Sequence, residues 1–148
     1  MTATHETKPL ILSADDEPGI CEMIKDVFED VEYEVITAGD GVQALDLIQE
    51  RMPDLVLLNI KMPRKSGIEV LHEMTQRYAD IAVVMLSAVT DLKIAVEAVR
   101  LGAADYLVKP LGVDEVVDSV QRALERRKLL LQNQGYAVYL ESQLVQKA

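Results

Sequence analysis

The chain has 148 residues, which suits one domain with a short remainder and suffices to bury a hydrophobic core. Its formal net charge of −10 argues against direct nucleic-acid binding by this segment, because nucleic-acid backbones attract cationic surfaces. The single cysteine, Cys21, cannot form an internal disulfide, and no apolar run approaches the roughly 20 residues of a membrane span. We therefore expect a cytoplasmic protein without a membrane segment, in which Cys21 is a small buried residue.

Residues 1–8 are polar and lack the apolar core of a signal peptide, so we expect a flexible lead-in. Short apolar runs then recur along the chain and predict five strands. Three of the runs are apolar throughout, which is typical of strands buried on both faces of a parallel sheet. The predicted strands are Leu10–Leu12, Tyr33–Thr37, Leu55–Leu58, Ile81–Leu86 and Tyr106–Val108.

The intervals between these runs carry apolar residues at helical spacing. Asp40 is placed to cap the second helix, and Ser66 and Glu69 form a capping box at the start of the third. Strands that alternate with helices predict an α/β fold with helices on both faces of the sheet. The helical patterns cover residues 20–28, 42–48, 66 onward, 92–99 and 113 onward.

Polar residues follow the predicted strands at their carboxyl ends, where open α/β sheets bind ligands. Neighbouring strands lie about 4.8 Å apart, so these side chains can converge on one pocket. The residues are Asp15, Asp16 and Glu17 after the first strand, Asn59 at the end of the third, Ser87 after the fourth and Lys109 after the fifth.

The residue types in this predicted pocket suit two ligands. Clustered acidic oxygens suit a hard cation such as Mg²⁺. Lys109 and the Ser87 hydroxyl suit a phosphoryl group, through charge and a hydrogen bond. Taken singly, each residue has a simpler explanation: Asp15 and Asp16 as helix caps, Ser87 as a turn residue and Lys109 as a solvated lysine. Their joint placement on four strand ends favours a ligand pocket.

Four segments resemble the response-regulator receiver domains of the CheY-like family: Leu10–Pro18, Pro53–Pro63, Val84–Ala88 and Asp105–Pro110. The resemblance covers residues 9–127. It implies a flavodoxin-like, doubly wound sheet of five parallel strands in the order 2-1-3-4-5, with an extended C-terminal helix. It also implies a role in two-component signal transduction, in which a sensor histidine kinase or phosphotransfer protein donates a phosphoryl group in a Mg²⁺-dependent reaction.

The resemblance assigns a role to each polar residue. Asp15, Asp16, the residue at position 59 and the backbone carbonyl of Lys61 resemble the family's metal ligands. Ser87 resembles the hydroxyl that follows the phosphoryl group, and Lys109 the lysine that pairs with it. Tyr106 resembles an aromatic switch residue, with a half-buried edge aromatic as the alternative. The Lys109–Pro110 bond resembles the family's cis peptide.

Asn59 departs from the family pattern, because it stands where the family has its phosphate-accepting aspartate. A neutral amide oxygen is a poor nucleophile and cannot form the acyl phosphate. The lost charge should also weaken Mg²⁺ binding. We therefore expect a signalling module that is not an enzyme. Two explanations stay open: a naturally phosphorylation-independent receiver, and a recent or engineered replacement. The retained Asp15, Asp16, Ser87 and Lys109 favour the second.

The helical pattern continues beyond residue 127, and residues 128–148 resemble a linker helix toward an output domain outside this chain. Residues 126–133 are similar to linkers that precede HD-GYP phosphodiesterase domains. A weak heptad pattern suggests a homodimer through this tail, with an unpartnered helix as the alternative, and Gly135 leaves the continuity of the helix open. The heptad residues are Leu124, Leu131, Val138 and Val145.

Two other classes fit less well. A haloacid dehalogenase-type phosphatase needs an alternating Asp-x-Asp pair, whereas Asp15 and Asp16 are adjacent. A flavodoxin-like flavin-binding module needs a hydroxyl- and glycine-rich phosphate loop after the first strand, where this chain has acidic residues that would repel phosphate.

Overall fold

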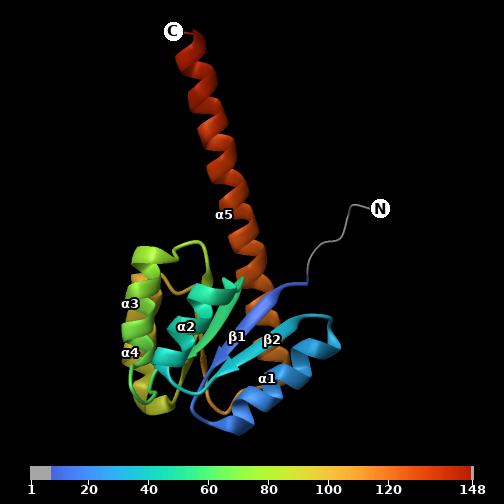
Figure 1. Cartoon of the computed structure of the whole chain (residues 1–148), viewed down its shortest axis with the longest axis vertical. Coiled ribbons are helices and arrows are strands. Elements are labelled where there is room, and N and C mark those ends of the chain that lie inside the picture. Colours follow the sequence, from blue (N-terminus) through green and yellow to red (C-terminus); the bar gives the residue numbers. More distant parts are fainter. Residues whose placement is uncertain (1–7, 148) are drawn as a thin grey trace.

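The computed structural model describes the backbone of residues 8–147 and the side chains of residues 8–133. Most of the predicted lead-in therefore lies outside the described residues. Five parallel strands form one sheet in the order β2-β1-β3-β4-β5, which confirms the expected topology (Figure 1). The strands are β1 Leu10–Ala14, β2 Glu34–Ala38, β3 Leu55–Asn59, β4 Ala82–Ser87 and β5 Asp105–Val108.

The central strand β3 is buried along its whole length, as its apolar run predicted. Strand β1 extends two residues beyond its predicted end, because Ala14 still pairs with Ala38 on one side and with Leu58 on the other. Ser13 lies inside this extension and is fully buried. Its hydroxyl lies 3.7 Å from the sulfur of Cys21, which is itself buried as expected.

Helices cover both faces of the sheet. The helices α1 and α5 pack on one face through apolar residues such as Phe28 and Val120. The helices α2, α3 and α4 pack on the other through residues such as Ile48 and Met74. None of the described helices is long and apolar enough to cross a membrane. The bounds are α1 Pro18–Asp30, α2 Gly41–Arg51, α3 Gly67–Arg77, a short 3₁₀ turn η1 Val89–Asp91, α4 Leu92–Leu101 and α5 Val113–Lys147.

The predicted caps of the second and third helices are confirmed. The side chain of Asp40 accepts a hydrogen bond from the backbone amide of Gln43, and Ser66 accepts one from the amide of Glu69. In contrast, α1 begins after Glu17 with no side-chain cap. Asp15 does contact the start of this helix, because its Oδ1 accepts a hydrogen bond from the backbone amide of Glu17 at 3.0 Å.

A close approach between β3 and α3 positions the end of β3. A Cβ atom on Gly67 would lie 2.1 Å from the carbonyl oxygen of Asn59, which no side chain tolerates. The amide of Gly67 donates to the carbonyl oxygen of Ile60 at 2.7 Å. Glycine thus lets the start of α3 lie directly against the strand end that carries Asn59.

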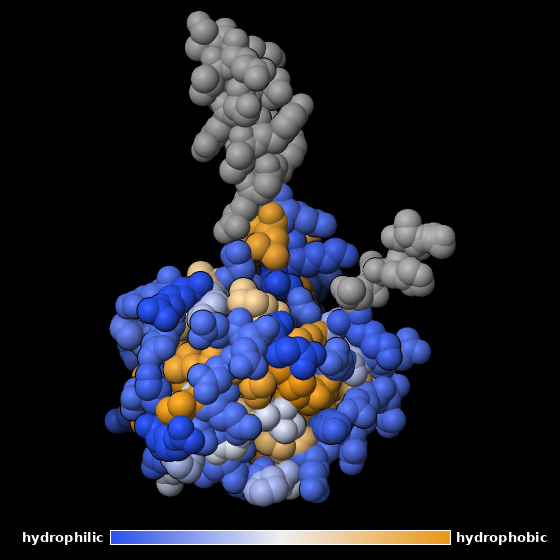
Figure 2. All heavy atoms as spheres, viewed as in Figure 1, coloured by the Kyte–Doolittle hydropathy of each residue, from blue (hydrophilic) through white to orange (hydrophobic). Residues whose placement is uncertain are grey.

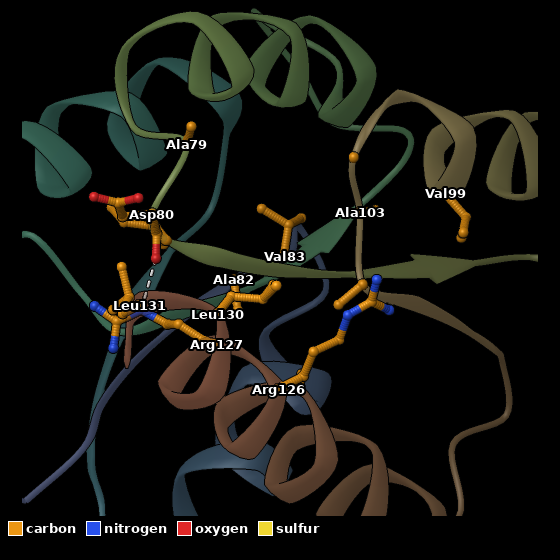
Figure 3. A pocket seen from close by; sticks show the side chains of 14 residues that line it. Ala79, Asp80, Ala82, Val83, Val99, Ala103, Arg126, Arg127, Leu130 and Leu131 are labelled. Atoms are coloured by element: carbon orange, nitrogen blue, oxygen red, sulfur yellow. Dashed lines mark hydrogen bonds between the residues drawn. The ribbon is translucent and has the colours of Figure 1, made fainter. Parts of the chain in front are cut away.

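The helix α5 is continuous through Gly135 and extends beyond the domain (Figure 1). Arg127 holds this helix against the amino edge of the sheet. Its Nε donates to the carbonyl oxygen of Asp80 at 2.6 Å (Figure 3). Another guanidinium nitrogen lies 3.1 Å from Asp54 Oδ1. A cavity of about 250 Å³ lies beside this contact, at the opposite end of the sheet from Asn59.

The first residue of the predicted heptad, Leu124, packs within the domain itself. Leu124 is partly buried and packs against the core that α1 and α5 cover, so it is not free for a tail partner. Leu129 and Leu130, in contrast, are about half exposed, and Figure 2 shows apolar atoms where α5 leaves the domain. The side chains of Val138 and Val145 lie outside the described residues.

Candidate functional site

The amide group of Asn59 lies at the centre of a polar cluster at the carboxyl edge of the sheet. Its nitrogen, Nδ2, lies 3.3 Å from Asp15 Oδ1, 3.2 Å from Asp16 Oδ1 and 2.8 Å from the carbonyl oxygen of Lys61. Asn59 is buried, whereas Asp16 is exposed. The structure thus brings three of the residues singled out in the sequence to within hydrogen-bond distance of the side-chain nitrogen of a fourth, Asn59.

Asp15 is the buried acid of the cluster, with 1% of its surface exposed. Its Oδ1 also accepts a hydrogen bond from the backbone amide of Glu17 at 3.0 Å. Burial raises the pKa of Asp15 above its usual value, and the nearby Lys109 partly offsets this effect. The ammonium of Lys109 lies 2.8 Å from Oδ2 but outside hydrogen-bond geometry, so Oδ2 has an ion-pair partner and no hydrogen-bond donor.

Lys109 reaches back across the sheet edge to the end of β1. Its Nζ also contacts Glu17 Oε1 at 2.9 Å. Burial alone lowers the pKa of Lys109, but the close negative charges of Asp15 and Glu17 outweigh it and raise that pKa above the usual value. The backbone amide of Lys109 donates to the carbonyl oxygen of Ser87, and the Lys109–Pro110 bond is cis.

Ser87 and Tyr106 make their contacts away from the acidic oxygens. Ser87 is fully buried, and its hydroxyl donates to the carbonyl oxygen of Ala88 at 2.8 Å. Tyr106 is half-buried and packs against the core beneath α2, α3 and α4. In the described part of the chain, no hydrogen bond joins either side chain to Asn59.

Two contacts near the site were not predicted from the sequence. Glu17 was grouped with the acids after the first strand, but its role as the second carboxylate that pairs with Lys109 was not expected. The buried Asp91 forms an ion pair with the exposed ammonium of Lys61 at 3.2 Å. This pair joins the loop after β3 to the turn before α4, and no sequence pattern indicates it.

The oxygen atoms of this site suit a hard cation. Asp15 Oδ1, Asp16 Oδ1 and the Lys61 carbonyl surround one point. The residues present therefore fit Mg²⁺, although the amide nitrogen of Asn59 lies at that point. No group of three or more acidic, histidine or cysteine side chains with metal-binding geometry occurs among residues 8–133. A metal here would thus depend on the backbone carbonyl.

A sequence profile for the response regulator receiver domain matches residues 11–121. The chain belongs to this family. The receiver is 38% identical over 114 residues to sporulation initiation phosphotransferase F of Bacillus subtilis, a match that covers 77% of the chain and 92% of that protein. It is also 38% identical over 119 residues to the regulatory protein AtoC of Escherichia coli, where the match covers 80% of the chain but 26% of the relative.

Solved structures agree with this assignment. A receiver domain protein from Clostridium thermocellum superposes with a TM-score of 0.78 at 34% identity and covers 82% of this chain and 98% of its own. NtrX from Brucella abortus gives a TM-score of 0.83 at 33% identity, over 88% of this receiver and 30% of NtrX. Several relatives are thus much longer than this chain. The family match decides against the phosphatase and flavodoxin alternatives.

Proposed function

We propose that this receiver keeps the ligand pocket of its family but accepts no phosphoryl group, because Asn59 stands at the acceptor position. In the family reaction a carboxylate oxygen attacks the phosphorus of a phosphohistidine, the P–N bond breaks, and the imidazole leaves. The observation that carries the proposal is the buried amide of Asn59 at the end of β3, beside Asp15 and Asp16. Its neutral oxygen lacks the charge and nucleophilicity that the attack requires.

The metal site would be formed by Asp16 directly, by Asp15 largely through water, and by the Lys61 carbonyl. Mg²⁺, when bound, would neutralise charge on a phosphoryl group. The affinity of hard cations depends on the number of charged ligands, so the amide at position 59 should weaken binding relative to a carboxylate. Lys109 would pair with phosphoryl oxygens in an intact receiver, and it pairs with Asp15 and Glu17 in this one.

Ser87 and Tyr106 would form the switch that responds to a phosphoryl group. A ligand shifts a conformational equilibrium only through different affinities for the two states. Without a phosphoryl group at position 59, the Ser87 hydroxyl has no partner that would draw it toward the side chain of Asn59. The hydrogen bond from Ser87 to the Ala88 carbonyl supports an inactive-like resting state. We infer that this state dominates whether or not a phosphoryl donor is present.

The partners follow from the family. We infer that a histidine kinase or a phosphotransfer protein docks on residues 9–127, and that residues 128–148 lead to an output domain. The linker resemblance makes an HD-GYP domain the candidate output. A homodimer through the tail would use residues beyond Leu124, since Leu124 packs against the domain core.

Backbone amide NMR spectra test whether Ser87 and Tyr106 respond to a phosphoryl donor. Acetyl phosphate with Mg²⁺ should leave the amide signals of Ser87 and Tyr106 unchanged in this chain. The Asn59→Asp variant, which restores the acceptor, should show large shifts at both positions. Donor-dependent shifts of equal size in the Asn59 protein would refute the proposal.

A further inference from the structure

The three oxygens around Asn59 Nδ2 are the same oxygens that would hold the metal. Asp15 Oδ1, Asp16 Oδ1 and the Lys61 carbonyl lie 3.3, 3.2 and 2.8 Å from the nitrogen. They come from the end of β1 and from the loop after β3, so the amide joins two separate segments of the site.

The chemistry of the neighbours fixes the orientation of the amide. The carboxylates and the carbonyl only accept hydrogen bonds, and the amide nitrogen only donates them. The opposite orientation would place Asn59 Oδ1 against three acceptors with no donor between them. The two hydrogens of Nδ2 are thus shared among three oxygens, one of which, Asp15 Oδ1, also accepts from the Glu17 amide.

The charges of the cluster show why a donor is needed at this point. Asp15, Asp16 and Glu17 carry three formal negative charges, and Lys109 is the cation that pairs with two of them. The ammonium of Lys61 is turned away and pairs with Asp91. Without a donor at the centre, acceptor oxygens would face one another across a partly buried space, which is unfavourable.

We propose that the carboxamide of Asn59 is a built-in substitute for the metal ion, which holds the acidic site together and makes the fold independent of Mg²⁺. This inference rests on the proposed function, because it takes the same oxygens as the metal ligands. Mg²⁺ binds oxygen at about 2.0–2.1 Å and would need the space that Nδ2 occupies. The ion therefore enters only when the amide gives up its three contacts and turns away.

Thermal unfolding of the full chain tests the substitution of amide for metal. The unfolding temperature is measured in EDTA and in millimolar Mg²⁺, with ionic strength matched by NaCl to separate binding from screening. The variants are Asn59→Ala, which removes the donor, and Asn59→Asp, which replaces it with a charge. The double variant Asn59→Asp with Asp16→Asn restores the original number of acids and serves as the control.

The Asn59 protein should unfold at the same temperature with and without Mg²⁺. Asn59→Ala and Asn59→Asp should both be less stable in EDTA, and Mg²⁺ should raise their unfolding temperatures by about 3–8 °C. The double variant should gain clearly less from Mg²⁺ than Asn59→Asp. A packing role for Asn59 would lower the stability of Asn59→Ala without creating a Mg²⁺ response.

Two results would overturn the inference: a Mg²⁺ stabilisation of the Asn59 protein equal to that of Asn59→Ala, or no Mg²⁺ response in Asn59→Ala. Neither result bears on phosphoryl transfer, because an amide accepts no phosphoryl group whether or not metal is bound. The inference and the proposed function can thus fail separately.

Discussion

Lys109 Nζ lies 2.8 Å from Asp15 Oδ2 and joins the carboxyl ends of β5 and β1 through a largely buried ion pair. Replacing Lys109 by Met keeps most of the aliphatic stem but leaves the Asp15 carboxylate buried without its cation. Removing one partner of a buried pair is strongly unfavourable, so we expect the free energy of unfolding to fall by about 2–4 kcal/mol. Urea unfolding at neutral pH measures this loss.

The double variant Lys109→Met with Asp15→Asn is the control for that measurement. Asp15→Asn removes the charge that the lysine balances, so the double variant should lose less stability than the sum of the two single variants. Additive losses would show that the two side chains do not interact.

Gly67 is predicted to tolerate no side chain, because a Cβ atom there would meet the backbone oxygen of Asn59 at 2.1 Å. Backbone must move to accept it, so Gly67→Ala should lower the free energy of unfolding by about 2–3 kcal/mol. Gly19→Ala is the matched control, since a Cβ atom at Gly19 meets nothing within 4 Å. It should leave stability unchanged or raise it slightly, because alanine favours helix. Equal losses in both variants would contradict the steric argument.

Arg127 is predicted to hold the first turns of the projecting helix against the domain. Arg127→Ala removes its contacts to the Asp80 carbonyl and to Asp54. Hydrogen exchange should then become faster for the amides of residues 124–131, with about 1–2 kcal/mol of global stability lost. Arg126→Ala is the control, because Arg126 is exposed and forms no ion pair among the described side chains. Exchange that is unchanged in Arg127→Ala would refute this role.

Cys21 is predicted to be unreactive in the folded protein. Burial raises the pKa of its thiol, so less of the reactive thiolate is present at a given pH than in the unfolded chain. The folded state therefore holds the thiol proton more tightly than the unfolded chain does. The contribution of this proton to the free energy of unfolding falls as the pH rises above the pKa of the thiol in the unfolded chain. A disulfide reagent at pH 8 should label the thiol slowly in buffer and rapidly in urea. Equally fast labelling in buffer and in urea would show that the Cys21 thiol is accessible in the folded protein.

Sequence patterns predicted the fold more fully than they predicted the site. Apolar runs located the strands, and the short polar side chains of Asp40 and Ser66 located two helix starts, because these signals are local. The strand order came from the family resemblance. Strand ends shift by one or two residues where pairing continues past the apolar run, as at Ala14.

The contacts within the site could not be read from the sequence, because they depend on side-chain orientations set by neighbours distant in the chain. The orientation of the Asn59 amide follows from oxygens on β1 and on the loop after β3. The pairing of Lys61 with Asp91 depends on how two loops meet. Heptad spacing likewise could not show that Leu124 packs against the domain itself.

The intact mass of the protein after incubation with acetyl phosphate and Mg²⁺ shows directly whether Asn59 blocks phosphorylation. The Asn59 protein should gain no phosphoryl group, whereas Asn59→Asp should gain one, which hydroxylamine removes because an acyl phosphate is labile to it. Lys109→Met in the Asn59→Asp background should reduce the gain, since the lysine would stabilise the transferred group. A stable phosphoryl adduct on the Asn59 protein would show that this receiver accepts a phosphoryl group.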